Sequence, residues 1–155
     1  MSKMKFVVFL MFIILHGCEQ RPQECRDVID VPREQGYATF RSYPLEKQLD
    51  VYLCGMHVEP PQIGLADEIA KQGDSTIPVV LQKLKTSERE IDQEALIYLF
   101  QVMSDRGLLR GRKDVIMEIG QVIDNMKISQ VKQRSEESLK KIQIANGVKP
   151  FTYTQ

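Results

Sequence analysis

The chain of 155 residues carries 21 basic and 21 acidic residues, so its formal net charge is zero. A neutral chain has no general electrostatic attraction to phosphate backbones, and we therefore expect no nucleic-acid partner. Tryptophan is absent and aromatic residues make up 7% of the chain, whereas Leu, Ile, Val, Glu, Lys and Gln are abundant; this composition favours one helical domain.

The first 17 residues have the layout of a secretory signal peptide. Lys3 and Lys5 precede ten uninterrupted apolar residues, Phe6 to Leu15, and the composition becomes polar from Glu19 onward. A positive start followed by about 7–15 apolar residues is typical of an export signal. A transmembrane helix needs about 20 apolar residues, so this run is too short to span a bilayer. We therefore predict that residues 1–17 direct export.

The end of this leader, Leu15-His16-Gly17-Cys18, resembles the lipobox of bacterial lipoproteins. In that family, processing enzymes recognise a leucine three positions before an obligatory cysteine and a small residue directly before it. His16 departs from the pattern, because a small or β-branched residue usually occupies its position. The resemblance implies that Cys18 becomes the first residue and carries a diacylglyceryl group, often with a third acyl chain, which anchors stably. The alternative is an ordinary secreted protein whose Cys18 forms a disulfide.

The same resemblance implies a location in the cell envelope, with the protein attached to a membrane surface through Cys18. An aspartate directly after the cysteine resembles an inner-membrane retention signal, but residue 19 is glutamate. We therefore expect the outer membrane, facing the periplasm, if the source has one, and otherwise the outer face of the cytoplasmic membrane. Without its two leader lysines the chain keeps 19 basic and 21 acidic residues, a formal charge of −2.

Two cysteines remain once Cys18 is assigned to lipid. Cys25 and Cys54 are an even pair in an exported chain, which predicts a disulfide between the N-terminal segment and the first helix. Closing a loop of about 30 residues stabilises by about 3–4 kcal/mol in the chain-entropy model. The alternative is two free thiols. Residues 18–43 are rich in Arg, Glu, Gln and Pro without an apolar period, so we expect a lipidated N-terminus and a tether there.

Residues 44–147 predict an all-α domain, and residues 148–155 a C-terminal tail. Apolar residues recur there at helical spacing, and Pro, Gly and capping residues interrupt them. The predicted helices cover about 44–57, 63–71, 77–85, 91–103, 113–127 and 130–145. Ser87 and Glu90 have the spacing of a capping box at the start of the fourth helix.

Residues 74–104 resemble a helical hairpin of the HEAT type. In that family a proline near the start of one helix and an alanine in the next let the two pack closely, and Pro78 and Ala95 occupy such positions. The family's usual Asp and Arg on the turn are missing. With 45–71 and 113–145 as partial repeats, the resemblance implies a short solenoid of stacked hairpins. The alternative is a compact bundle of five or six helices.

Few side chains in the chain favour catalysis. After the leader, His57 is the only histidine, and its position at the end of a helix predicts a capping or surface role. Cys25, Cys54 and His57 lack the short spacing of a zinc site. We therefore assign no catalytic residue, metal or cofactor.

Two charged clusters are the remaining polar features. The first consists of Glu88, Glu90, Asp92 and Glu94. We expect these acids to face solvent at the start of a helix, where the helix dipole favours them. The second consists of Arg106, Arg110, Arg112 and Lys113, around Leu108 and Leu109. These cations either contact anionic lipid or an acidic partner, or are solvated while the leucines pack inward.

The leading hypothesis is a non-enzymatic one: a lipid-anchored helical module that binds or scaffolds another protein, of unknown identity, at the cell envelope. The first alternative is an enzyme or accessory subunit that acts on envelope material such as peptidoglycan. The second is an immunity-type inhibitor of a toxin. Buried carboxylates converging in one cleft favour the enzyme, whereas a shallow surface lined by apolar residues favours the binding module.

Overall fold

The computed structural model describes residues 21–149, and every regular element in this range is helical. The predicted all-α class is therefore confirmed. The elements are α2 (Gln23–Ile29), α3 (Arg33–Ser42), α4 (Leu45–Met56), α5 (Gly64–Ala70), the 3₁₀ turn η1 (Asp74–Thr76), α6 (Ile77–Thr86), α7 (Glu90–Asp105), α8 (Lys113–Asp124) and α9 (Ser129–Ala145). Cys18 and the predicted leader 1–17 lie outside the described residues. In the described range, no helix is long and apolar enough to cross a membrane.

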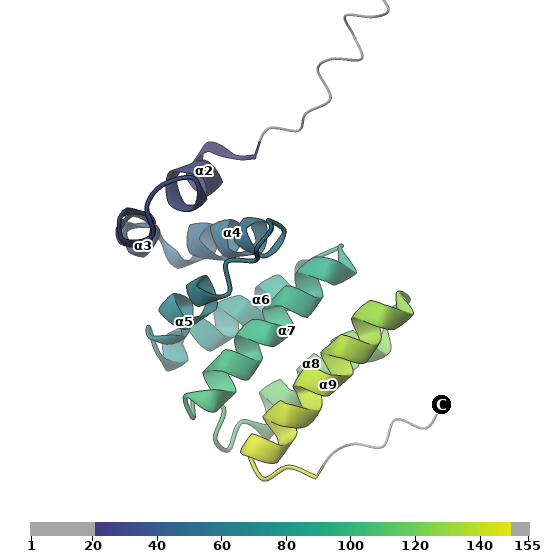
Figure 1. Cartoon of the computed structure of the whole chain (residues 1–155). Helices are drawn as coiled ribbons and strands as arrows, with labels where there is room; N and C mark the ends of the chain where they lie inside the picture. Colours follow the sequence, from purple (N-terminus) through teal and green to yellow (C-terminus); the bar gives the residue numbers. More distant parts are fainter. Residues whose placement is uncertain (1–20, 150–155) are drawn as a thin grey trace, which may run out of the picture.

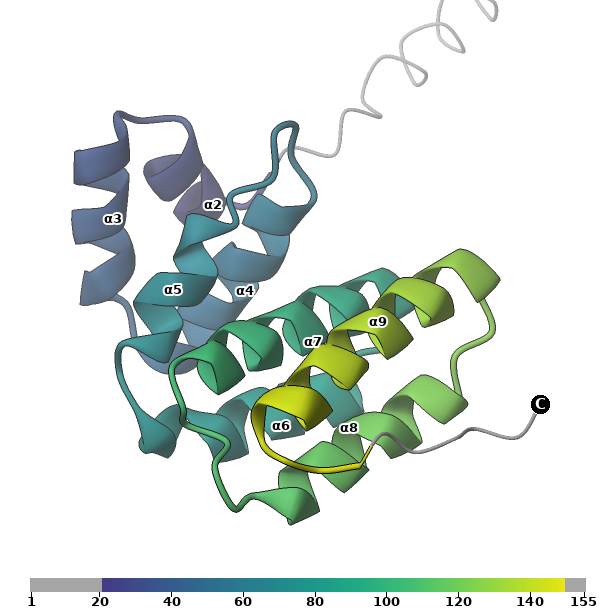
Figure 2. The ribbon, with the colours of Figure 1, turned by 60° about the horizontal axis from the view of Figure 1, so that its bottom comes forward.

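Consecutive helices form four hairpins that stack on one another (Figure 1). The hairpins are α2–α3, α4–α5, α6–α7 and α8–α9. Each hairpin contacts the next through both of its helices, so that α2, α4, α6 and α8 form one layer and α3, α5, α7 and α9 form the other. Figure 2 shows this arrangement for the last two hairpins, where α7 and α9 lie above α6 and α8. This is the contact pattern of stacked hairpins, in which each unit packs mainly on its neighbours.

The first hairpin differs from the tether that was expected over residues 18–43. That expectation was wrong for residues 23–42, which form α2 and α3. Both helices are polar and bury few side chains, so they lack the apolar stripe that reveals a helix in sequence. Gly36 brings them together: a Cβ atom at this position would lie 2.1 Å from the carbonyl oxygen of Val28. Only glycine permits this close approach of α3 to α2.

A disulfide between Cys25 and Cys54 joins α2 to α4, with the two Cα atoms 6.3 Å apart. Cys25 is buried, whereas Cys54 is partly accessible on the last turn of α4. The bond therefore fastens the first hairpin to the second at the end of the stack that leads to Cys18.

One continuous apolar core runs through the stack. It is made of side chains with almost no solvent exposure, including Phe40, Leu49, Leu65, Ile77, Leu96, Phe100, Ile116 and Ile142. Tyr52 of α4 lies within it and donates a hydrogen bond of 2.6 Å to the carbonyl of Ala95 in α7. Burial raises the pKa of the Tyr52 phenol, so the hydroxyl stays a donor at neutral pH.

Each junction between neighbouring hairpins carries an ion pair in both layers. In the layer of α2, α4, α6 and α8 the pairs are Lys47–Glu24 (3.1 Å), Lys83–Asp50 (2.7 Å) and Lys85–Glu118 (2.7 Å). In the other layer they are Arg41–Glu68 (3.2 Å), Arg106–Asp67 (2.9 Å) and Arg134–Glu94 (2.8 Å). Pairs of this kind are individually weak when exposed, but together they fix which face of each hairpin meets the next.

Candidate functional site

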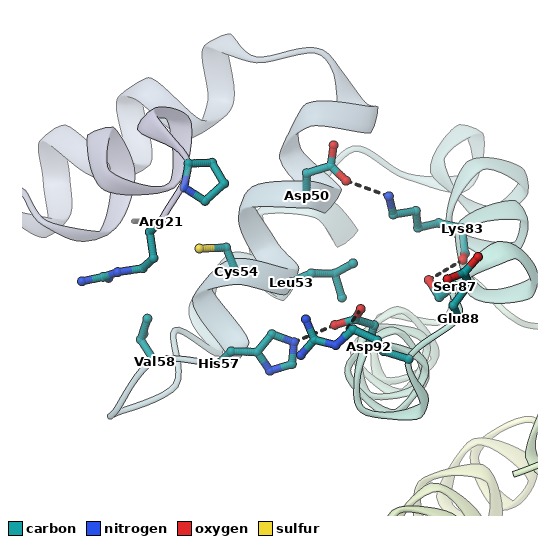
Figure 3. Close-up of a pocket in the computed structure, with 12 residues that line it drawn as sticks. Arg21, Asp50, Leu53, Cys54, His57, Val58, Lys83, Ser87, Glu88 and Asp92 are labelled. Carbon is teal, nitrogen blue, oxygen red and sulfur yellow. Dashed lines mark hydrogen bonds and ion pairs between the residues drawn. The ribbon is translucent and has the colours of Figure 1, made fainter. Parts of the chain in front are cut away.

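A cleft of about 700 Å³ opens between the second and third hairpins (Figure 3). We call it the His57 cleft. α4 contributes Asp50, Cys54 and His57, while the end of α6 and the start of α7 contribute Lys83, Ser87 and Asp92. Ligand sites in proteins commonly have volumes of about 300–1,000 Å³, so this cleft is large enough for a small molecule or for several side chains of a partner.

His57 occupies the C-cap position of α4, the end-of-helix place that the sequence predicts. Its backbone N–H donates to the Cys54 carbonyl at 3.2 Å, which closes the last turn of α4. The ring also reaches the third hairpin, where Nε2 lies 2.6 Å from Oδ1 of Asp92. The two side chains are 25% and 16% exposed. This pair therefore links two hairpins at the floor of the cleft.

The hydroxyl and the sulfur that line the cleft are engaged in other interactions. Ser87 Oγ donates to the Lys83 carbonyl at 2.8 Å, and the sulfur of Cys54 is bonded to Cys25. In many hydrolases an aspartate orients a histidine, which then acts as a general base on a nucleophile within hydrogen-bonding reach. In this cleft Asp92 orients the His57 imidazole, but the nearby hydroxyl and sulfur are already engaged.

The acidic cluster does not form the solvent-facing run that was expected. Glu90 accepts hydrogen bonds from the backbone N–H groups of Lys127 and Ile128, at 2.7 and 2.8 Å, and these lower its pKa. Asp92 pairs with His57, and Glu94 with Arg134 across the α7–α9 junction. The expectation holds for Glu88, which is exposed. It was wrong for the other three acids, because their side chains meet partners from other hairpins, which the one-dimensional spacing does not show.

The capping box predicted from Ser87 and Glu90 is also wrong. Arg89 occupies the N-cap position of α7, without a hydrogen bond from its side chain. The Ser87 hydroxyl bonds back to α6. Glu90 accepts from the N–H groups of Ile128, the N-cap of α9, and of Lys127, the residue before it, instead of from those at the start of α7. The same carboxylate thus caps a neighbouring helix.

In the basic loop after α7 the two leucines pack inward, as the second interpretation of this loop expected. Leu109 is fully buried and Leu108 packs against the core. Arg106 donates to Asp67 of α5 at 2.9 Å and lowers the pKa of that carboxyl, and Arg112 pairs with Asp114 at 3.4 Å. Arg110 and Lys113 are exposed. Two of the four predicted contact residues are therefore engaged in ion pairs within the domain.

A second cavity, of about 420 Å³, lies between α4 and α6, in the layer that α2, α4, α6 and α8 form. We call it the α4–α6 groove. Leu49, Pro78 and Val79 form its apolar part, and Glu46, Gln82 and Thr86 surround them. The ion pair between Asp50 and Lys83 borders both this groove and the His57 cleft. The sequence marks Pro78 as a helix start, but no local pattern shows that α4 and α6 form a groove.

In the range 21–149, no cluster of three or more His, Cys, Asp or Glu side chains is arranged to hold a metal ion. The carboxylates of the His57 cleft do not converge, since Asp50 pairs with Lys83 and Asp92 with His57. Glu88 is exposed at its rim.

Comparison of the chain with protein-family models, with curated proteins and with solved structures finds no match.

Proposed function

We propose that this chain is a lipid-anchored protein of the cell envelope whose stacked hairpins bind another protein. The proposal rests on the short separation in sequence between the lipobox-like segment and the first helix of the stack. The lipobox-like Leu15-His16-Gly17-Cys18 is followed by only four residues before the hairpin stack begins at Gln23. A lipidated Cys18 would then hold a rigid helical surface next to the membrane.

The α4–α6 groove is the surface that we assign to the protein partner. Solenoids of stacked hairpins bind partners along extended surfaces formed by several units. The groove combines an apolar centre at Pro78 and Val79 with a rim of Gln82, Lys83 and Glu46. Apolar centres surrounded by polar rims are typical of protein interfaces. The preferred partner is a protein segment with a few apolar side chains that cover Pro78 and Val79 and with polar side chains that meet Gln82 and Glu46 at the rim.

Photo-crosslinking in native membranes tests this assignment. A photoreactive amino acid replaces Gln82 at the rim of the groove, and in the control it replaces Gln121, which is exposed on α8. We expect a discrete cross-linked protein from position 82 and none from position 121. Val79→Arg in the same chain should abolish that product. Identical products from both positions would show that the groove is not the binding surface.

One observation favours the alternative of an envelope-acting enzyme, namely the 2.6 Å contact between His57 and Asp92 in an open cleft. If this alternative holds, purified chain should cleave isolated envelope material, and His57→Gln should remove that activity without unfolding the protein. Val79→Arg should leave it unchanged, because Val79 lies outside the His57 cleft. Under the binding proposal, neither the wild type nor either variant releases fragments.

A further inference from the structure

The place where the chain leaves the domain constrains how an anchored molecule is oriented. Arg21 and Pro22, directly before α2, line the His57 cleft, and Figure 3 shows Arg21 on the same side as Val58 and His57. Three residue steps separate Cys18 from Arg21, and an extended chain covers at most about 3.6 Å per step, or about 11 Å in all. A lipid on Cys18 therefore keeps this side of the stack close to the membrane surface.

Two exposed isoleucines lie on the same edge of the stack. Ile91 is the second residue of α7 and is 43% exposed, and Ile128 directly precedes α9 and is 53% exposed. His57 lines both its own cleft and a second groove, of about 360 Å³, that Ile91 also lines. The carboxylate of Glu90, next to Ile91, binds the backbone N–H of Ile128. The linings of the two pockets and this hydrogen bond thus lead from Arg21 by way of His57 and Ile91 to Ile128, while the Arg21 guanidinium itself pairs with Asp30 at 3.2 Å.

We infer that this edge, where α7 and α9 begin, lies against the bilayer and that Ile91 and Ile128 insert among its head groups; the inference rests on the proposed lipid anchor. Large apolar side chains next to a membrane surface are stabilised by burial at the boundary between head groups and acyl chains. Arg89 and Lys127 accompany the isoleucines in sequence and are exposed; Arg89 also lies 3.7 Å from Asp92, and the exposed Glu88 precedes it. Basic side chains at this depth reach lipid phosphates with their charged ends while their stems stay apolar.

In this orientation the basic loop lies on the edge opposite to the bilayer, where α7 ends. α7 has 16 residues, which span about 24 Å at 1.5 Å per residue, and Arg106 directly follows its last residue. Figures 1 and 2 both show the loop between α7 and α8 at the end of the stack away from the point where the chain leaves toward Cys18. Arg110 and Lys113 therefore face away from the anchoring bilayer and do not bind its lipids.

The absence of tryptophan from the sequence makes single tryptophans clean depth probes. The lipidated chain, which begins at Cys18, is reconstituted in vesicles of equal parts phosphatidylethanolamine and phosphatidylglycerol whose acyl chains carry bromine, a quencher of tryptophan fluorescence. The probes are Ile91→Trp and Ile128→Trp. The matched control is Ile144→Trp, because Ile144 is 63% exposed on the last turn of α9, the helix that Ile128 precedes. Circular dichroism of each variant checks the fold, and flotation of the vesicles checks the anchor.

We expect the two edge probes to be quenched and to emit at shorter wavelengths, while the Ile144→Trp probe behaves as in water. Equal signals from all three probes in a chain that floats would overturn the orientation but leave the anchor standing. A chain that carries no lipid and does not float would refute the anchor, and the orientation with it. Hydrogen exchange of the wild-type chain is an independent readout: vesicles should slow exchange at residues 125–128 and leave residues 107–112 unchanged.

Discussion

The first and third hairpins of the stack are held by different means. α6 and α7 have 10 and 16 residues and bury a wide apolar stripe that includes Ile77, Leu84 and Phe100. α2 and α3 have 7 and 10 residues, and of their side chains little more than Cys25, Val28 and Phe40 is buried. The first hairpin compensates with a covalent bond to α4 and with the close approach at Gly36. The third hairpin is thus held in the stack by buried apolar area, and the first hairpin by a disulfide.

This difference has a functional consequence under the proposed anchor. The first hairpin is the unit nearest Cys18, so any force or motion of the membrane attachment reaches it first. A disulfide restrains it without the large apolar surface that a longer helix pair would bury. The third hairpin lies inside the stack, contacts both of its neighbours and needs no such bond.

The largest effect is expected from the core of the third hairpin. Phe100→Ala removes a fully buried ring and should lower the free energy of unfolding by about 3–5 kcal/mol. Because the core is continuous, the whole domain should lose stability in one transition, as measured by urea unfolding followed by circular dichroism. Gln121→Ala on the exposed face of α8 is the control and should change it by less than about 0.5 kcal/mol. A small effect of Phe100→Ala would show that the third hairpin does not depend on apolar burial.

Removal of the disulfide should act on the first hairpin. The cysteines are 29 residues apart, and a loop of that size predicts a loss of about 3–4 kcal/mol when both are replaced by serine. Hydrogen exchange should show α2 and α3 losing protection while α7 and α9 keep theirs. An equal loss of protection in all four helices would contradict the proposed difference between the two hairpins.

Gly36→Ala should separate α2 from α3. Alanine normally stabilises a helix relative to glycine by about 0.5–1 kcal/mol, but here the new methyl group would collide with the Val28 carbonyl. We therefore expect a net loss of about 1–3 kcal/mol, as for other overpacked sites. Gln35→Ala, at the exposed neighbouring position, is the matched control. Stabilisation by Gly36→Ala in thermal unfolding would mean that the helices are not in close contact.

The smallest effect concerns the polar link between the third and fourth hairpins. The N–H groups of Lys127 and Ile128 lower the pKa of Glu90, so the ionised carboxylate stabilises the fold at neutral pH. This contribution is present above the ordinary carboxyl pKa of about 4.3 and is lost as the pH falls through the lowered value. Glu90→Gln should therefore reduce the acid sensitivity of the melting temperature. The same acid sensitivity in both proteins would show that Glu90 does not link the hairpins.

The helices from α4 onward are predictable from sequence because each carries an apolar stripe of helical period. The predicted segment 44–57 corresponds to Leu45–Met56, and 113–127 to Lys113–Asp124. The first hairpin is not predictable in this way, because α3 owes its packing to a glycine and one buried phenylalanine, Phe40. A missing side chain leaves no periodic signal.

The site is less predictable than the fold. The position of His57 at a helix end follows from its sequence context, but its partner Asp92 lies 35 residues away in another hairpin. Ion pairs across the junctions join residues that are 23 to 40 positions apart, because the hairpins have unequal lengths. Without a constant repeat, the pairing of charges becomes visible only when the hairpins are stacked.

The proposed lipid on Cys18 would hold this stack of hairpins at a membrane surface. Metabolic labelling with an alkyne-bearing fatty acid, in cells that make lipoproteins, tests it most directly. We expect the wild-type chain to be labelled and to pellet with membranes, and Cys18→Ala to be unlabelled although it folds and retains the Cys25–Cys54 bond. Equal labelling of both chains, or an unlabelled wild-type chain, would contradict the claim.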